Sequence, residues 1–195
     1  MPLHEKELAL NFEPFPILKT DRLILRQFQV KDAVDLFKLR TDDKVMKYLG
    51  SPKMKDIDEA KAYIEKARKI KNGDTCIEWS LTLKEEDKLI GKLGFWRIIK
   101  THFRAELGYT MLPSYQSKGI MSEALNAILK YGFQIMKIHS VEANLDPKNE
   151  KSVNLLKRNG FTKEGQTKES YYFDGAFTDT SIYGLLKKDW EKNTI

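Results

Sequence analysis

Cysteine, histidine and long apolar runs are nearly missing from this chain. The single cysteine, Cys76, excludes an internal disulfide, and three scattered histidines match no metal-ligand spacing. No apolar stretch approaches the roughly 20 residues of a membrane-spanning helix. The N-terminal stretch carries Glu5 and Glu7 and lacks the apolar segment of a signal peptide. We therefore expect a cytoplasmic protein with no metal and no membrane partner.

A strong charge of one sign is also lacking. The 34 basic residues are interleaved with 28 acidic ones, which leaves a formal net charge of +6. No run of lysine and arginine reaches the density of a nucleic-acid-binding arm, so no specific nucleic-acid partner is predicted. The surplus fits a solvated surface, or affinity for an anion such as a phosphorylated cofactor.

Enough apolar sequence is present for one domain. Hydrophobic residues make up 41% of the 195 positions, which excludes a disordered chain and fits a single domain over residues 1–195. Residues 1–17, with Pro14 and Pro16, are predicted to form an irregular lead-in.

Hydrophobic spacing in the first half predicts strands and helices. A strand over residues 23–28 precedes a helix that Asp32 is expected to cap, and a second helix is expected to end at Asn72–Gly73. The segment between these helices is polar. Residues 77–83 alternate between apolar and polar side chains, which predicts a half-buried strand that leads into a hairpin.

The second half continues this alternation of elements. Apolar residues from Met121 to Met136 recur at helical spacing and predict one amphipathic helix. The other predicted elements are strands over 89–99, 104–112, 140–145, 161–173 and 178–186, and a short helix from Asn149 that ends at Asn159–Gly160. The order predicts an α/β fold with a mixed sheet and helices on both faces.

Residues 113–124 connect the strand over 104–112 to the amphipathic helix. A helix N-terminus offers unpaired N–H groups and about half a positive charge, which suits a phosphate. Gly119 would let the backbone approach such an anion, and Lys118 would add charge. The segment lacks the signatures of a P-loop and of a dinucleotide-binding turn. By itself it also fits an ordinary strand-to-helix connection.

Gln116-x-x-Gly119-x-Met121 resembles the Gln/Arg-x-x-Gly-x-Gly/Ala loop with which the GNAT superfamily binds the pyrophosphate of coenzyme A. Met121 departs from the small residue usual there, and its side chain is expected to turn into the core. Gly119-Ile120-Met121-Ser122 is similar to the RimJ/RimL branch, the ribosomal-protein N-acetyltransferases. Further segments resemble that branch in the same order: Thr20-Asp21-Arg22-Leu23, Leu89-Ile90-Gly91, Glu106-Leu107-Gly108-Tyr109, and Asn149-Glu150-Lys151-Ser152 followed by Asn159-Gly160-Phe161.

The resemblance implies a GNAT-like fold with a mostly antiparallel sheet in which two strands splay apart to hold acetyl-CoA. Pantetheine would bind the backbone of Thr110, Met111 and Leu112 and the side chain of Asn149. Gln116 belongs to the same loop. The backbone N–H groups that would hold the pyrophosphate are those of Ser117, Lys118, Gly119, Ile120, Met121 and Ser122.

Acetyl transfer to an amine needs a base, an oxyanion donor and a proton for the departing thiolate. Glu78 lies on the polar face of its strand and resembles the carboxylate proposed as base in RimL-like enzymes. Glu106, on the strand that lines the cofactor cleft, is the rival base. Either carboxylate could instead be a solvent-facing residue or the partner of a nearby cation. A strand N–H near Met111 is the candidate oxyanion donor.

Ser152 matches the RimL-like serine proposed to protonate the thiolate, and Tyr109 and Tyr115 are alternative proton donors. A local hydrogen bond within the helix would equally explain Ser152. Asn149 could cap that helix, hold pantetheine, or do both.

The resemblance implies acetyl transfer from acetyl-CoA to a primary amine, with a protein N-terminus, such as that of a ribosomal protein, as the leading acceptor. The alternative within the enzyme class is a small amine: a polyamine, an amino acid or an antibiotic. A catalytically silent acyl-CoA-binding module is the alternative from another class. Acceptor choice depends on residues 41–55 and 173–179, whose pattern is uninformative. The oligomeric state stays open, with a homodimer among the compatible assemblies.

Overall fold

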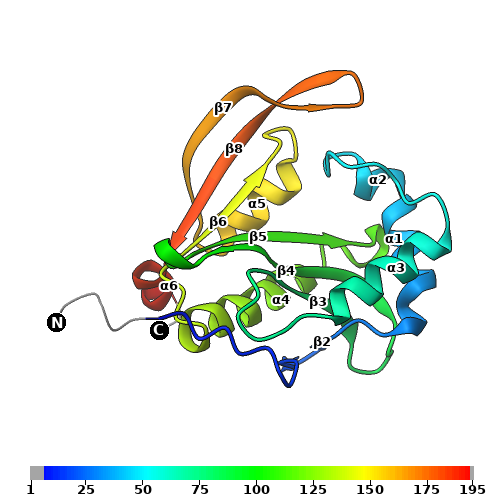
Figure 1. Cartoon of the computed structure of the whole chain (residues 1–195). Coiled ribbons are helices and arrows are strands. Elements are labelled where there is room, and N and C mark those ends of the chain that lie inside the picture. Colours follow the sequence, from blue (N-terminus) through cyan, green and yellow to red (C-terminus); the bar gives the residue numbers. More distant parts are fainter. Residues whose placement is uncertain (1–6, 194–195) are drawn as a thin grey trace.

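An eight-stranded sheet forms the centre of the computed structural model, which describes residues 7–193. The strand order is β1-β2-β3-β4-β5-β6-β8-β7 (Figure 1). Strands β5 and β6 are parallel, and the other six neighbouring pairs are antiparallel. This mixed, mostly antiparallel sheet confirms the predicted fold class.

The elements alternate along the chain much as the hydrophobic spacing predicts. The strands are β1 (Leu18–Lys19), β2 (Leu23–Arg26), β3 (Ile77–Leu83), β4 (Leu89–Ile99), β5 (Arg104–Met111), β6 (Ser140–Leu145), β7 (Thr162–Phe173) and β8 (Ala176–Leu186). The helices are α1 (Ala33–Thr41), α2 (Asp43–Met46), α3 (Ile57–Arg68), α4 (Ile120–Lys130), α5 (Glu150–Arg158) and α6 (Lys187–Asn193). Short 3-10 turns lie at Val30–Asp32, Lys100–His102 and Pro113–Tyr115, and a π-helical turn at Tyr131–Ile135 extends α4.

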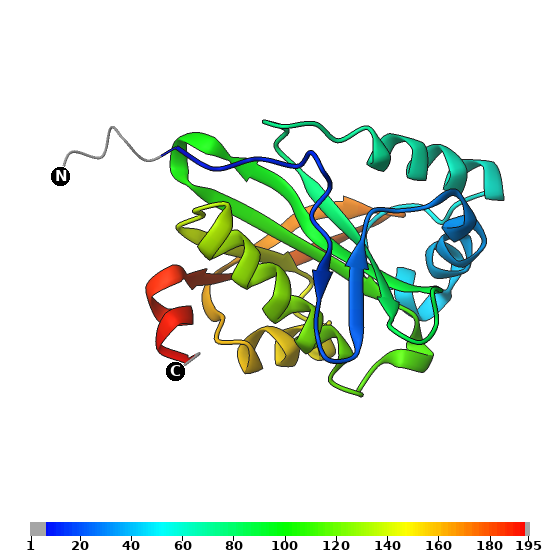
Figure 2. The same ribbon diagram turned by 90° about the horizontal axis from the view of Figure 1, so that it is seen from below.

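Helices cover both faces of the sheet. Helices α4 and α5 lie along one face of the sheet (Figure 2). The larger apolar cluster, which includes Trp79, Leu93 and Phe95, joins these helices to the strands. A smaller cluster, which includes Leu36 and Ile64, joins α1 and α3 to the other face. The whole apolar stripe of α4 is buried, and Met121 turns into the core as expected.

Some boundaries differ from the predictions for physical reasons. Phe28 lies beyond β2 and packs among α1 and α3. Asp32 precedes α1, but its side chain does not cap that helix, because it is bound to Arg26 at 2.8 Å and to the N–H of Gln29. Helix α3 ends at Arg68, before Asn72–Gly73.

Three short elements were not predicted: β1, α2 and α6. Helix α2 lies within the polar segment and is capped by Asp42, which accepts from the N–H groups of Lys44 and Val45. The predicted irregular lead-in extends outside the described residues at 1–6, and residues 7–17 form no helix or strand.

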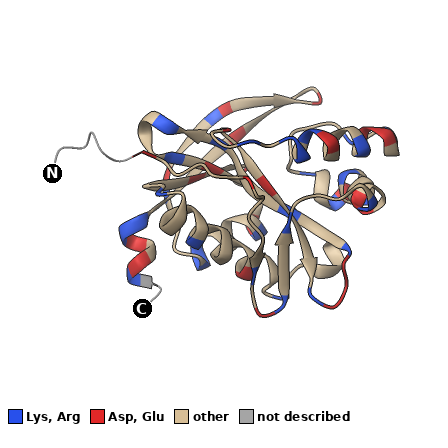
Figure 3. Ribbon diagram, turned by 60° about the horizontal axis from the view of Figure 1, so that its bottom comes forward, with Lys and Arg blue, Asp and Glu red and all other residues tan. Residues whose placement is uncertain are grey.

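Charges of both signs are interleaved over the surface elements (Figure 3). Within residues 7–193, no helix is long and apolar enough to cross a membrane. No cluster of three or more His, Cys, Asp or Glu residues in that range is arranged to hold a metal ion.

Candidate active site

Strands β5 and β6 pair for three residues and then separate. Glu106 and Glu142 are the last paired positions, yet β5 continues to Met111 and β6 to Leu145. Beyond these two residues, β5 and β6 form no further backbone pairs with each other in the described part of the chain. Unpaired strand edges can bind an extended ligand through main-chain hydrogen bonds.

The loop after β5 presents backbone N–H groups at the start of α4. Ser117 and Gly119 both have positive φ, at 62° and 74°. Gly119 is the N-cap of α4 and has no side chain to satisfy the first turn. Among the described residues, no N–H group from 117 to 122 donates to a protein acceptor. This arrangement suits an anion.

The turn between β1 and β2 clamps this loop. Arg22 donates to the carbonyl of Lys118 at 3.0 Å and pairs with Glu123 at 2.6 Å, and Thr20 also donates to Glu123. Burial raises the pKa of Glu123, but the hydrogen bonds from Thr20 and Arg22 outweigh it, so the net shift is downward. The segment Thr20–Leu23, which resembles the RimJ/RimL branch, therefore holds the loop after β5 in place.

Gln116 also fixes the loop. Its side-chain amide donates to the carbonyl of Met111 at 3.0 Å and accepts from Lys151 at 3.2 Å. The ammonium group of Lys118 lies 5.8 Å from the ring centroid of Tyr115. Next to this loop, a hollow of about 450 Å³ is lined by Asp42, Asp43, Lys44, Leu112, Pro113 and Ser114.

Two hydroxyl groups meet on the α4–α5 side of the sheet. The phenol of Tyr109 and the hydroxyl of Ser152 are 2.5 Å apart. Burial raises the pKa of Tyr109 to about 12, and the bond with Ser152 offsets part of that rise. Asn149 caps α5 by accepting from the N–H of Ser152 at 3.2 Å. The cap predicted for Asn149 is therefore present, whereas the Ser152 hydroxyl contacts Tyr109 instead of nearby backbone.

Glu78 belongs to a polar cluster on the opposite side of the sheet, which faces α1 and α3. It accepts from the ammonium group of Lys92 at 2.6 Å and from the phenol of Tyr63. Lys92 also donates to the Tyr63 oxygen at 2.7 Å. Burial, followed by the Glu78 carboxylate, raises the pKa of Tyr63, so this phenol stays protonated. The Tyr63 and Lys92 partners were not predicted.

Glu106 is buried, with only 7% of its surface exposed, at the point where β5 and β6 separate. One carboxylate oxygen pairs with Arg97 at 2.6 Å, and the other accepts from Asn144 at 2.8 Å. Thr110, further along β5, has a buried hydroxyl without a hydrogen-bond partner among the described residues.

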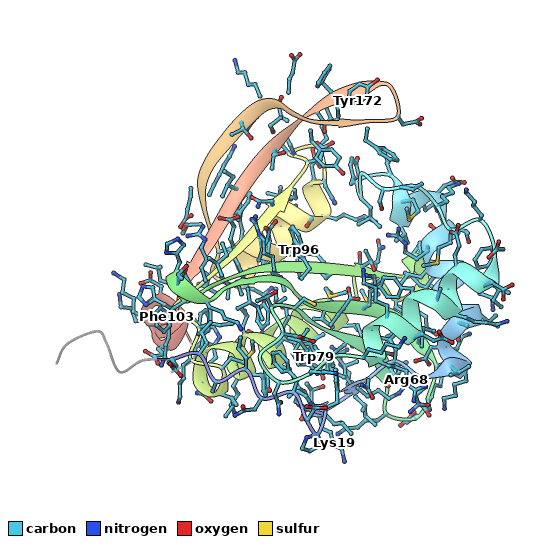
Figure 4. All side chains as sticks on the ribbon, in the orientation of Figure 1. Lys19, Arg68, Trp79, Trp96, Phe103 and Tyr172 are labelled. Atoms are coloured by element: carbon cyan, nitrogen blue, oxygen red, sulfur yellow. The ribbon has the colours of Figure 1, made fainter. Side chains whose placement is uncertain are left out.

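Trp96 is a second feature of this side of the sheet that was not predicted from the sequence. It is 53% exposed and lies on the opposite side of β4 and β5 from the buried Trp79 (Figure 4). A signal for it exists in the sequence: the core positions Phe95 and Ile98 are three residues apart, which breaks the period of two and indicates an extra residue.

Comparison with known proteins agrees with this geometry. The model of the acetyltransferase (GNAT) domain matches residues 22–162. The uncharacterized N-acetyltransferase YoaA of Bacillus subtilis is 35% identical over 89% of this chain and 98% of its own length. The ribosomal protein uS5-alanine N-acetyltransferase of Escherichia coli is 30% identical over 89% of this chain and 92% of its own length.

A solved structure shares the fold. The spermidine N-acetyltransferase of Vibrio cholerae, in complex with CoA and spermine, superposes with a TM-score of 0.77 at 23% identity, over 88% of this chain and 99% of that one. The diverging strands and the helix N-terminus thus occur here in a chain with acetyltransferase relatives. The protein belongs to the GNAT acetyltransferase family and is an acetyl-CoA-dependent N-acetyltransferase.

Proposed function

We propose that the protein acetylates the α-amine of a protein N-terminus. Acetyl-CoA would lie between the diverging ends of β5 and β6, with its pyrophosphate on the N–H groups of residues 117–122. These N–H groups have no acceptor in the described part of the chain, which supports this placement. The buried hydroxyl of Thr110, which has no hydrogen-bond partner within residues 7–193, supports a ligand along the same strand, because buried polar groups normally have partners.

The charges on the sheet face toward α1 and α3, which we call the acceptor side, favour one class of acceptor. The side chains of residues that pair across neighbouring strands point to the same face of the sheet. Glu106 and Glu142 therefore lie on the face that also holds Glu78. Each of these carboxylates is paired with a cation: Glu78 with Lys92, Glu106 with Arg97, and Glu142 with Arg104. A polyamine would need free carboxylates for its several positive charges, whereas a peptide N-terminus brings a single amine.

The names of two relatives agree with this acceptor. The Escherichia coli protein at 30% identity acts on an alanine of ribosomal protein uS5, and a second relative from that organism is a ribosomal-protein-serine acetyltransferase that is 33% identical over 52% of this chain. Both names specify an amino acid of a ribosomal protein as the acetyl acceptor, and the first specifies N-acetylation.

Residues on the two faces of the sheet would carry out different proton transfers. Acetyl-CoA supplies the activated acetyl thioester. The neutral amine forms the new C–N bond, and the C–S bond breaks. On the acceptor side, Glu78 would remove the proton from the amine through water, because Glu78 is separated from β5 by β4, about 10 Å at the usual strand spacing.

On the other side, Ser152 would donate a proton to the departing thiolate. Tyr109 can refill Ser152, since its pKa of about 12 keeps the phenol protonated at neutral pH. A strand N–H near Met111 would stabilise the oxyanion. Glu106 remains the rival base, because it lies on β5 itself at the separation point.

The test is thiol release from acetyl-CoA with a matched acceptor panel. Peptides with a free α-amine and an initial Ala, Ser or Thr would be compared with N-terminally blocked peptides that contain lysine, with spermidine, and with free amino acids. We expect the free α-amines to react fastest. Faster turnover of spermidine would assign the protein to the small-amine class, and coenzyme A binding without any turnover would indicate a silent module.

A further inference from the structure

Trp96 is the extra residue of a β-bulge. Phe95 pairs with Leu107 and Arg97 pairs with Glu106, which leaves Trp96 without a partner on β5. A bulge re-aims the side chain of the extra residue and is common beside active sites. Here it directs a large, half-exposed indole onto the acceptor side of the sheet, level with the separation of β5 and β6.

The indole lies over bare backbone. The nearest atom to a Cβ placed on Gly108 would be Cδ1 of Trp96, at 3.3 Å. Gly108 is paired with Gly94, so two adjacent strands carry no side chain beneath and beside the ring. The space next to Gly108 is therefore bounded by one aromatic wall and a floor of main chain.

The wall is held in place by its neighbours. The guanidinium carbon of Arg97 lies 5.3 Å from the ring centroid of Trp96, within the range of a cation–π interaction. Arg97 is in turn paired with the buried Glu106, which is bound to Asn144 on β6. Because these contacts on both diverging strands hold the indole, it can limit the space for a substrate without moving aside.

We propose that Trp96 sets an upper limit on the size of the acceptor's first side chain, so that Gly, Ala, Ser and Thr are accepted and larger residues are rejected. This inference rests on the proposed function. The attacking nitrogen must reach the gap that opens beyond Glu106, and the side chain of the first residue starts two bonds from that nitrogen. It therefore falls beside Gly108, where the indole takes up the room.

The test compares peptides that differ in the first residue alone: Ala, Ser, Val, Leu and Phe. Wild-type protein should favour Ala and Ser. Trp96→Ala should raise kcat/KM for the Leu and Phe peptides relative to the Ala peptide by about tenfold or more, since a single methylene group in a pocket is worth roughly 10- to 200-fold. Arg97→Ala should change the same ratio in the same direction, by less, because the ring is loosened but not removed.

Ile135→Ala is the matched control, because Ile135 is a large apolar residue of similar exposure, 55%, in the π-helical turn that extends α4 on the other side of the sheet. It should leave the ratio unchanged. An unchanged ratio in Trp96→Ala, an equal loss with every peptide, or a wild-type protein that already accepts Phe would overturn the inference while leaving the proposed function intact. Failure of wild-type protein with every peptide, together with turnover of spermidine, would overturn both.

Discussion

The two faces of strands β3, β4 and β5 carry different kinds of residue. On the face toward α4 and α5, Trp79, Leu93 and Phe95 are completely buried in an apolar core. On the other face, Glu78 and Lys92 form an ion pair, and Trp96 is half exposed. One face therefore supplies most of the hydrophobic stabilisation, while the other is free to carry polar groups that would cost stability in a core.

This division also separates the two halves of the proposed reaction. Tyr109 and Ser152, the candidate proton donors, lie on the α4–α5 side, and Glu78 lies on the α1–α3 side. A base and an acid placed on opposite sides of the sheet can act on the amine and the thiolate without neutralising each other. Substitutions on each side should therefore produce distinguishable defects.

The largest expected effect is on the cofactor loop. Gly119→Glu should weaken coenzyme A binding by at least about a hundredfold, because it places bulk and negative charge where the pyrophosphate is proposed to lie. Coenzyme A at 100 times its Kd should stabilise the wild-type protein by about 2.7 kcal/mol, which thermal unfolding can measure. That stabilisation should vanish in the variant.

Gly175→Glu is the control for this loop. Gly175 also has a positive φ, 79°, and lies in the turn between β7 and β8, where no atom of the described residues is within 4 Å of an added Cβ. It imposes a similar backbone strain away from the loop and should leave the coenzyme A effect in place. A folded Gly119→Glu protein that binds coenzyme A normally would show that the loop is not the pyrophosphate site.

The second prediction concerns the acceptor side. Glu78→Gln should lower kcat at neutral pH by at least about a hundredfold, with coenzyme A affinity nearly unchanged. A peptide α-amine has a pKa of about 8, so the loss should shrink as pH rises and more amine is neutral without help. The measurement is kcat against pH.

Glu106→Gln separates the two carboxylates. If it shows the pH-rescued defect while Glu78→Gln is nearly silent, the base is Glu106. Its position on β5 gives direct access to the separation point, whereas its pairing with Arg97 and Asn144 favours a role in holding Trp96. In that second role, Glu106→Gln should alter peptide selectivity more than the pH profile.

The third prediction concerns the α4–α5 side. Ser152→Ala should slow the acyl-transfer step by about tenfold to a hundredfold, at or below the usual range for acid catalysis, because Tyr109 remains nearby. High pH should not rescue it, since protonation of a thiolate becomes no easier there. Single-turnover kinetics would measure the step, and rescue at high pH would contradict the assignment of Ser152 as acid.

The difference between buried and exposed faces explains which helices and strands could be predicted from the sequence. The alternation over β3 and the apolar stripe of α4 predict these elements because one face of each packs into the apolar core. The prediction that β3 is half-buried is wrong, because Ser80 and Thr82 on its polar face are buried as well. Short elements such as β1 and α2 give no such signal, since two to four residues contain less than one period of a pattern. They are fixed by contacts that arise after folding, such as the Asp42 cap.

The candidate site was predictable in part for the same reason. The loop around Gly119 is contiguous in sequence, so its strand-to-helix context could be inferred before folding. The partners of Glu78 could not, because Tyr63 comes from α3 and Lys92 from a neighbouring strand whose register depends on the bulge. Side-chain pairs of this kind depend on tertiary packing, which local patterns do not encode.

The smallest expected effect tests how firmly the cofactor loop is clamped. Glu123→Gln should lower the free energy of unfolding at pH 7 by about 1–2 kcal/mol, because it weakens charge-assisted bonds to Arg22 in a partly exposed site. The net pKa of Glu123 is lowered in the folded state, so its carboxylate contributes stability above the ordinary glutamate pKa of about 4.3. That contribution is lost as pH falls through the lower folded value. The difference in Tm between wild type and variant should therefore be greatest at neutral pH and disappear in acid.

Glu150→Gln is the control, since Glu150 lies in the first turn of α5 and makes no ion pair with another described residue. A similar loss in both variants would assign the effect to the helix dipole instead of the clamp.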